Sequence, residues 1–292
     1  MRDFSTDHRW LSINTATVRR QRGQDWGLLE ILDACAARGI RAVSPWRDQV
    51  AAAGLQATAA RVRAHGLALS GYCRGGMFTY TDAASRQAAR DENRHALDEA
   101  CTLGAPCLVL VVGALPGALA GRPAHRDLAG ARQQVAEEMA ELLAEARTRG
   151  MPLAIEPLHP MYAADRACVN TLEHALDLCD ALDPARSGAL GVAVDAYHVW
   201  WDPKLQDQIA RAGGSRLLAF HVCDWLVPTT HLLEDRGMMG DGVIDLARLR
   251  GWVEDAGFAG YSEVEIFSRA NWWLRDGGEV LDTCIERHRR CV

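Results

Sequence analysis

Residues 151–195 read MPLAIEPLHPMYAADRACVNTLEHALDLCDALDPARSGALGVAVD, and this stretch contains one repeating unit of the predicted fold. It begins with a short apolar run, MPLAIE at 151–156, which ends in a carboxylate. An amphipathic segment with helical spacing follows at 171–182, and a second apolar run, ALGVAVD at 189–195, again ends in a carboxylate. A buried strand, a helix and another buried strand are typical of a parallel α/β sheet.

The same alternation continues in both directions along the chain. The predicted strands are residues 10–15, 40–44, 67–73, 107–112, 151–156, 189–195, 216–222 and 261–267. The predicted helices are residues 26–38, 48–64, 83–103, 126–148, 171–182, 203–212, 245–256 and 278–289. Eight strands, each followed by a helix, predict an α/β fold, a closed (β/α)8 TIM barrel. An open doubly wound sheet is the runner-up, but no glycine-rich phosphate loop follows the first strand.

Length and composition fit one such barrel. The 292 residues match the roughly 250 or more that a TIM barrel needs. No Pro-rich or Ser-rich linker divides them, so we expect a single domain over residues 1–292. No apolar run approaches the roughly 18 residues of a membrane span, and the start of the chain lacks a signal-peptide core. We therefore expect no membrane partner and, by default, a cytoplasmic location.

Charge and cysteine content narrow the partners further. The formal net charge of −6 argues against nucleic acid, because phosphate binding recruits an excess of Lys and Arg. The nine cysteines are scattered without a C-x-x-C pair, which indicates reduced thiols rather than a zinc or redox motif. A small-molecule ligand is the expected partner. A homo-oligomer or a small partner subunit stays open, since such barrels associate without a readable signature.

Four successive predicted strands end in a residue type that binds metals. Glu156 ends the fifth strand, Asp195 ends the sixth, His221 lies in the seventh with Asp224 just after it, and Glu265 lies in the eighth. Barrel enzymes carry their sites at these carboxyl ends of the strands. Any one such residue taken alone has a structural alternative, in which loop amides satisfy it. Four together predict a shared site.

Glu156, Asp195, His221 and Glu265 are predicted to hold one divalent metal ion. A carboxylate inside a barrel is costly unless it is paired or bound to a metal. Three carboxylates and one imidazole suit Mn²⁺, Mg²⁺, Co²⁺ or Zn²⁺, and the oxygen-rich set favours Mn²⁺ or Mg²⁺. An octahedral ion would keep two positions for adjacent oxygens of a substrate.

The motifs IEPLHP, VDAYH, HVCDW, GDGVID and VEIF resemble the xylose isomerase-like TIM barrel, or sugar phosphate isomerase/epimerase, superfamily, which is also related to AP endonuclease family 2. The resemblance implies a sugar or polyol substrate, metal binding by the same four residues, and acid-base roles for Glu156 and Glu265. Chemistry agrees, because a metal that chelates a carbonyl and its neighbouring hydroxyl acidifies the intervening C–H and stabilises the enediolate.

Three further residues are candidates near this site. His198 follows Asp195 in a D-x-x-H spacing that resembles the family element whose histidine contacts a substrate oxygen; a helix-capping loop histidine is the alternative. His159 in EPLHP is predicted as an added catalytic acid-base group, or else a plain loop histidine. Arg236 lies in a glycine-containing loop and is predicted to bind substrate, with a solvated ion pair to a neighbouring acidic residue as the alternative.

The first three strands depart from the epimerase pattern. The second ends in SPWRD and the third in CRGGMF. Trp46, Arg47 and Arg74 are predicted to bind substrate there, with Met77 and Phe78 adding apolar surface. Packing at the barrel rim explains the apolar members equally well.

The predicted function is a metal-dependent isomerase or epimerase that removes a proton next to the carbonyl of a ketose, a keto-inositol or a related keto-sugar. The alternative is a lyase that uses the same enolate for β-elimination, of the C-glycoside deglycosidase or inosose dehydratase type. The acidic charge disfavours an endonuclease. The intact ligand set disfavours a barrel used only for binding.

Overall fold

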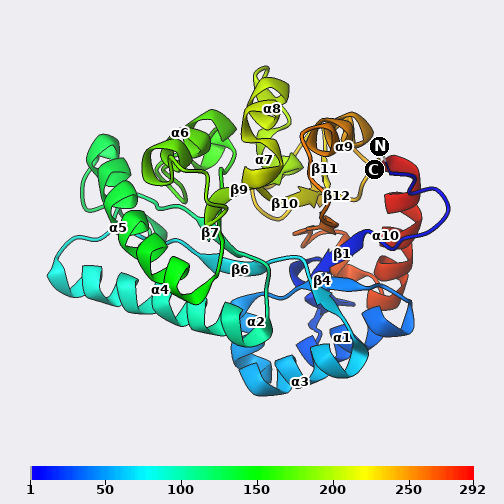
Figure 1. The fold of residues 1–292 in the computed structure, drawn as a ribbon. Coiled ribbons are helices and arrows are strands. Elements are labelled where there is room, and N and C mark those ends of the chain that lie inside the picture. The colour runs from blue at the N-terminus through cyan, green and yellow to red at the C-terminus, as the bar shows by residue number, and fades with distance from the viewer. Residues whose placement is uncertain (1) are drawn as a thin grey trace.

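The computed structural model describes residues 2–292, and its parallel strands form a barrel surrounded by helices (Figure 1). The strands are β1 (Leu11–Asn14), β4 (Ala42–Ser44), β5 (Ala68–Leu69), β6 (Tyr72–Gly75), β7 (Leu108–Val111), β8 (Leu153–Glu156), β9 (Leu190–Asp195), β10 (Leu217–Val222) and β13 (Ser262–Val264). Their order is β5-β4-β1-β13-β10-β9-β8-β7-β6. The predicted TIM barrel is confirmed.

The third barrel position differs from the prediction of one strand over residues 67–73. It consists of two pieces, because β5 pairs with β4 whereas β6 pairs with β7. Ser70 donates its backbone N–H to Val43, and Cys73 donates to Pro45. The chain therefore shifts sideways between β5 and β6, and the two pieces together join the second strand of the barrel to the fourth.

Ten α-helices follow or interrupt the strands within residues 2–292. They are α1 (Leu28–Ala37), α2 (Arg47–Ala53), α3 (Leu55–His65), α4 (Ala83–Leu103), α5 (Leu128–Arg149), α6 (Leu172–Leu182), α7 (Ala196–Val199), α8 (Leu205–Arg216), α9 (Leu246–Asp255) and α10 (Gly277–Cys291). Side-chain caps fix several starts; Asp82, for example, accepts from the backbone of Ser85 at the start of α4.

Two predicted helices need correction. The helix expected at 48–64 is two helices, because Gly54 has φ 89° and breaks the path between α2 and α3. The helix expected at 203–212 continues to Arg216, with a kink at Gly213, where φ is 61°. The Gly213-Gly214 pair lies inside α8.

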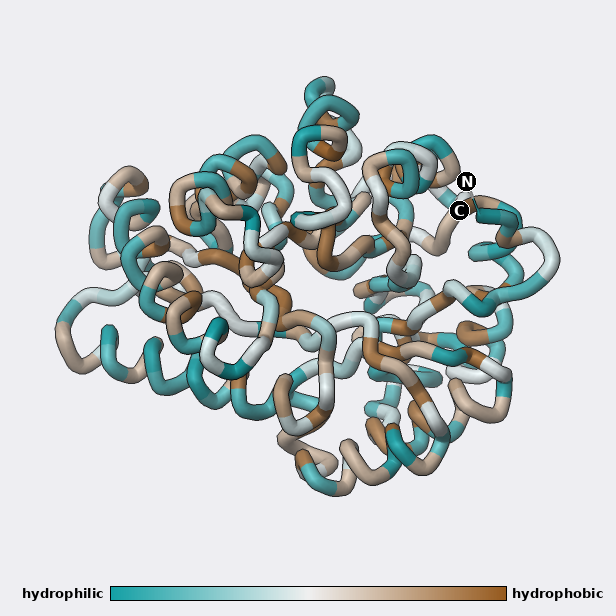
Figure 2. Tube along the Cα trace, viewed as in Figure 1, coloured by the Kyte–Doolittle hydropathy of each residue, from teal (hydrophilic) through white to brown (hydrophobic). Residues whose placement is uncertain are grey.

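The core lies between the barrel wall and the helices, and apolar segments run through the centre of the molecule while hydrophilic stretches lie on the outer helices (Figure 2). All six residues of β9 are buried. The cysteines are free thiols, most of them buried. No helix within residues 2–292 has both the length and the apolar composition that crossing a membrane requires.

Parallel pairing aligns the carboxyl ends of the strands at one mouth of the barrel. His221 of β10 lies opposite Asp195 of β9 on one side and Glu263 of β13 on the other. Glu156 of β8 lies opposite Val111 of β7. Two short antiparallel ribbons add to the loops: β2 (Arg20–Gln21) with β3 (Gln24–Asp25), and β11 (Asp224–Trp225) with β12 (Arg236–Gly237).

Candidate metal centre and its cavity

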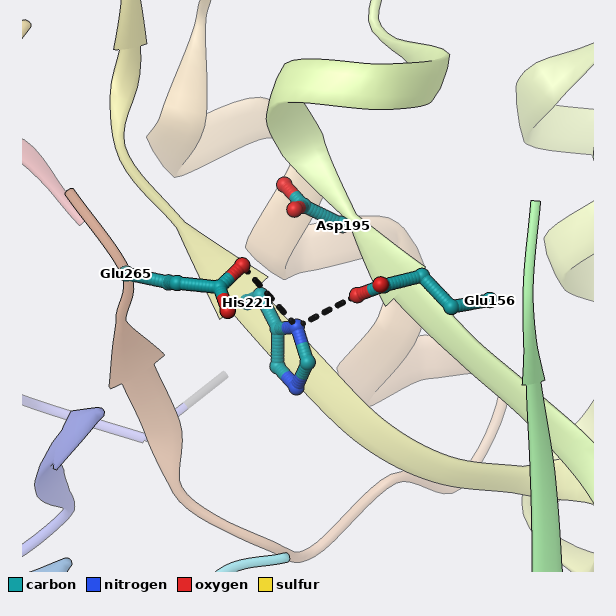
Figure 3. A group of neighbouring side chains, drawn as sticks. All are labelled: Glu156, Asp195, His221 and Glu265. Carbon is teal, nitrogen blue, oxygen red and sulfur yellow. Dashed lines mark ion pairs between the residues drawn. The ribbon is translucent and has the colours of Figure 1, made fainter. Parts of the chain in front are cut away.

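The barrel register brings the four predicted ligands together. Glu156 ends β8, Asp195 ends β9, His221 lies in β10 and Glu265 follows β13 directly. One ligand atom from each lies within 4.8 Å of the others. No side chain of the four is more than 7% exposed. The side chains point toward one another from the carboxyl ends of their strands (Figure 3).

The imidazole of His221 stands between two carboxylates. Its Nδ1 atom lies 2.8 Å from Oε1 of Glu156 and 3.7 Å from Oε2 of Glu265. Among residues 2–292, neither Nδ1 nor Oε1 of Glu156 has a hydrogen bond of normal geometry despite this proximity. Buried polar atoms are rarely left without a partner. The donor set and its unsatisfied atoms therefore fit a divalent cation.

Burial and charge shift the ionisation of this cluster. Burial raises the pKa of Asp195 to about 6, although the Arg236 guanidinium opposes the shift. Burial likewise raises the pKa of Glu265. Burial alone would lower the pKa of His221, but the nearby carboxylates, Glu263 first, outweigh it and raise that pKa well above its usual value. Without a cation, the cluster therefore tends to hold protons.

Arg236 contacts two of the four clustered residues and is not a surface arginine. Its Nη1 atom lies 3.0 Å from Oδ2 of Asp195 and 3.0 Å from Oε2 of Glu265. Its guanidinium also lies over the ring of Tyr197, 4.5 Å from the centroid. The alternative of a solvated ion pair with Glu234 or Asp235 is wrong, because the Arg236 side chain is only 3% exposed.

His198 lies beside Arg236, with Nη2 of Arg236 3.2 Å from its Nε2. Its Nδ1 atom accepts the backbone N–H of His159 at 3.2 Å. Burial lowers the pKa of His198 well below its usual value, so the ring is neutral and one of its two nitrogens carries the proton. Both His198 and Arg236 line the same cavity, where they are available to a substrate oxygen.

His159 has a different setting from the one predicted for a catalytic group. Its ring stacks on Trp225 at 4.8 Å between centroids and meets Trp201 edge-on at 5.7 Å. Burial lowers its pKa. It is not among the residues that line the cavity beside the ligands. Its link to the site is its backbone N–H, which donates to Nδ1 of His198 and orients that ring.

A cavity of about 140 Å³ adjoins the cluster. Its lining consists of Trp46, Arg74, Met77, Val111, Leu119, Glu156, Leu158, Tyr162, Arg166, His198, Leu233, Arg236, Glu265 and Phe267. Of the predicted substrate-binding residues, Trp46, Arg74, His198 and Arg236 therefore share this cavity. Arg47 does not line it, because its guanidinium contacts Glu92 and Glu99 instead.

A second layer lies beneath the ligands and was not predicted. Glu263 is 1% exposed and accepts from Nδ2 of Asn14 and from Oγ of Ser70, each at 2.7 Å. Its Oε1 atom lies 3.5 Å from Nε2 of His221. The sequence held a signal for it, since Glu263 precedes Glu265 by two residues and alternate strand residues share a face.

The segment between β11 and β12 covers the cavity. The hydroxyl of Tyr197 donates to the carbonyl of Leu232 at 3.1 Å, and the hydroxyl of Tyr162 donates to the same oxygen. Leu233 beside it lines the cavity. Asp224, which follows the seventh strand, accepts the backbone N–H groups of Gly240 and Ile244 and thereby orders the loop that follows β12. It is not part of the ligand cluster.

Fold and site together define a (β/α)8-barrel with three carboxylates and one imidazole gathered at its mouth. Residues 32–284 match the family model described as the xylose isomerase-like TIM barrel. The chain belongs to this family, whose relatives include sugar isomerases and epimerases.

Comparisons with individual proteins agree with the family. The chain is 24% identical to an inosose isomerase of Bacillus velezensis over 157 residues, which is 53% of this chain and 55% of that protein. The match thus spans about half of the curated relative. The crystal structure of SMc04130 from Sinorhizobium meliloti 1021 is 57% identical, covers 97% of this chain and 98% of its own, and superposes with a TM-score of 0.90.

A third comparison concerns the fold alone. The structure of the IOLI protein with a bound zinc atom has a TM-score of 0.77 with this chain at 19% identity. The match covers 94% of each chain.

Proposed function

We propose that this protein is a divalent-metal-dependent isomerase or epimerase that moves a proton beside the carbonyl of a ketose, a keto-inositol or a related keto-sugar. The position of Glu156 and Glu265 carries the proposal, because both belong to the ligand cluster and both line the cavity. The similarity to an inosose isomerase supports the same class of reaction.

The four clustered residues would hold one divalent cation. Mn²⁺ is the first choice, because carboxylate oxygens dominate the donor set. The zinc atom in the IOLI structure supports a divalent ion in this fold. When bound, such an ion polarises a carbonyl oxygen and makes the neighbouring C–H more acidic.

The protein's own side chains would transfer the proton. One of the two glutamates takes it from the carbon next to the carbonyl, so that a C–H bond breaks and an O–H bond forms on the carboxylate. Return of a proton to the opposite face of that carbon gives an epimer, and return to the neighbouring carbon gives an isomer. The guanidinium of Arg236 would stabilise negative charge on a substrate oxygen, and His198 beside it would hydrogen-bond to the substrate.

The test combines metal analysis with solvent deuterium incorporation into ketoses, keto-inositols and 3-keto-glycosides. We expect the Mn²⁺-loaded protein to incorporate deuterium. Glu156→Gln and Glu265→Gln should each slow incorporation by about 100- to 10,000-fold, since each removes a general acid-base group. Glu141→Gln on the exposed face of α5 is the matched control and should keep the full rate.

Metal content gives a second readout. Asp195→Asn and His221→Ala should lower the metal bound per chain, because each removes a ligand. Full deuterium incorporation by chelator-treated, metal-free protein would overturn the proposal.

Elimination is the alternative outcome of the same proton removal. Once a carboxylate has removed the proton, the electrons of the resulting enolate can also expel a leaving group from the next carbon. Product analysis with a 3-keto-glycoside separates the two: release of the aglycone or of water indicates a lyase, whereas an isomeric sugar indicates the proposed reaction.

A further inference from the structure

Arg74 lies in β6, at the third position of the barrel, and lines the same cavity as Glu156 and Glu265. Within residues 2–292 no ion pair or side-chain hydrogen bond satisfies its guanidinium. The neighbouring arginines differ. Arg47 is paired with Glu92 and Glu99, and Arg236 with Asp195 and Glu265. Arg74 is therefore a cation held in the wall of the cavity without a protein partner.

Arg74 is partly buried, and a partly buried cation without a protein partner is unfavourable in the folded protein. Burial lowers the pKa of Arg74, and the negative charge of Glu156 only partly offsets this effect. A guanidinium in this position is able to form charge-assisted hydrogen bonds to an anionic ligand.

The surroundings of Arg74 fit an acidic ligand that also carries an apolar or sugar framework. Arg166, the third arginine of the lining, lies over the ring of Tyr162 and has only the half-exposed Asp165 nearby, at 3.8 Å. Trp46 forms an aromatic wall, because its ring meets Phe267 edge-on at 5.3 Å. The carboxylates in the lining of the cavity are therefore available to a cation, and the guanidinium groups are available to an acidic part of the ligand.

We propose that Arg74 binds an acidic group of the substrate, a carboxylate or a phosphate, and that the protein acts on an anionic keto-sugar. This inference rests on the proposed function, because it assigns the substrate class of the same site. The planar guanidinium presents two parallel N–H groups that match two oxygens of such an acid. The acid would lie against Arg74 while the reacting carbons lie between Glu156 and Glu265.

The test measures binding of three ligands that share one carbon chain and undergo no reaction: sorbitol, gluconate and sorbitol 6-phosphate. Calorimetry with the Mn²⁺-loaded protein gives their affinities. We expect one of the two acids to bind about 10- to 100-fold more tightly than sorbitol, the range of a charge-assisted hydrogen bond. The acid that binds more tightly assigns carboxylate or phosphate.

Variants separate Arg74 from the metal ion, which also attracts anions. Arg74→Gln should remove most of the preference for the acid. Its affinity for sorbitol should stay within about two-fold of that of the original protein. Arg74→Lys should restore part of the preference, because the charge returns without the planar fork. Arg63→Gln, an exposed arginine of α3, is the matched control and should behave as the original protein does. If Arg74→Gln fails to fold, Arg74→Met serves in its place.

Equal affinity for sorbitol and both acids would overturn the inference. So would an unchanged preference for the acid in Arg74→Gln or Arg74→Met. Because these ligands are not converted, the outcome does not depend on turnover. If the acids bind through Arg74 but no keto-sugar incorporates deuterium, the anion site stands and the proposed reaction is rejected.

Discussion

At the scale of single residues, Glu263 lies on the Nε2 side of His221, whereas the Nδ1 atom of that ring faces Glu156. The carboxylate of Glu263 is fixed from two sides by Asn14 and Ser70 and lies 3.5 Å from Nε2 of His221. A carboxylate behind a metal-binding imidazole favours the proton on the far nitrogen. The near nitrogen, Nδ1, is then free for the cation beside Glu156.

Glu263→Gln should weaken metal binding by about 10- to 100-fold, as replacement of such supporting carboxylates does. The amide keeps the size of the side chain, so the fold should persist. Competition with a fluorescent chelator measures the affinity, and circular dichroism checks the fold. Glu279→Gln, near the exposed start of α10, is the control. Metal affinity equal to that of the unsubstituted protein would show that Glu263 does not orient His221.

At the scale of elements, the segment between β11 and β12 contributes Leu233 to the lining of the cavity. It leaves the β11–β12 ribbon after Trp225 and returns to it at Arg236, which contacts Asp195 and Glu265. Two tyrosines from other elements hold it through one carbonyl, that of Leu232. Its order therefore depends on contacts distant in sequence.

The double variant Tyr162→Phe, Tyr197→Phe should loosen this segment. Each hydroxyl contributes about 1 kcal/mol through its hydrogen bond, so amide hydrogen exchange in residues 226–235 should become several-fold faster. Substrate KM should rise more than kcat falls, because the ligand cluster itself is intact. Tyr261→Phe removes a hydroxyl elsewhere on the barrel and is the control. Unaltered exchange in residues 226–235 would contradict the role assigned to the two tyrosines.

At the scale of the whole molecule, the two ends of the chain meet beside the barrel (Figure 1). Phe4 stacks on His288 of α10 with 4.6 Å between ring centroids, and Arg289 donates to the carbonyl of Ser5. The His288 ring is fully buried, and neither of its nitrogens has a hydrogen-bond partner within residues 2–292. Burial lowers the pKa of His288 to about 3.

This histidine should make the global stability depend on pH. Its ordinary pKa is 6.5 and its folded value about 3, so between these values only the unfolded chain takes up the proton. Stability therefore falls as the pH drops below 6.5, by roughly 2 kcal/mol at pH 5 from this group. Urea unfolding from pH 7 to pH 5 measures the loss.

His288→Phe should remove that contribution, while His95→Phe, at an exposed position of α4, should leave it in place. The same loss of stability in His288→Phe as in the original protein would show that His288 is not the responsible group.

The architecture could be predicted because its signals are local. The period of apolar residues separates strands from helices within each segment, and parallel strands bring their carboxyl ends to one mouth. For that reason the sequence alone placed Glu156, Asp195, His221 and Glu265 in one cluster, as the structure does. It did not predict the split of the third strand or the break at Gly54, since both depend on backbone geometry.

Contacts between distant segments were decided only by the tertiary structure. Arg236 reaches Asp195 across 41 positions, and Asn14 reaches Glu263 across 249. The same folding directs Arg47 to Glu92 and Glu99 and packs His159 against Trp225, while it leaves Arg74 unpaired in the cavity. A side chain's partners follow from which elements meet in space, and local periodicity carries no information on those meetings. The sequence alone therefore determined the barrel and its four-residue cluster, and the tertiary structure decided which charges surrounding the cluster are neutralised.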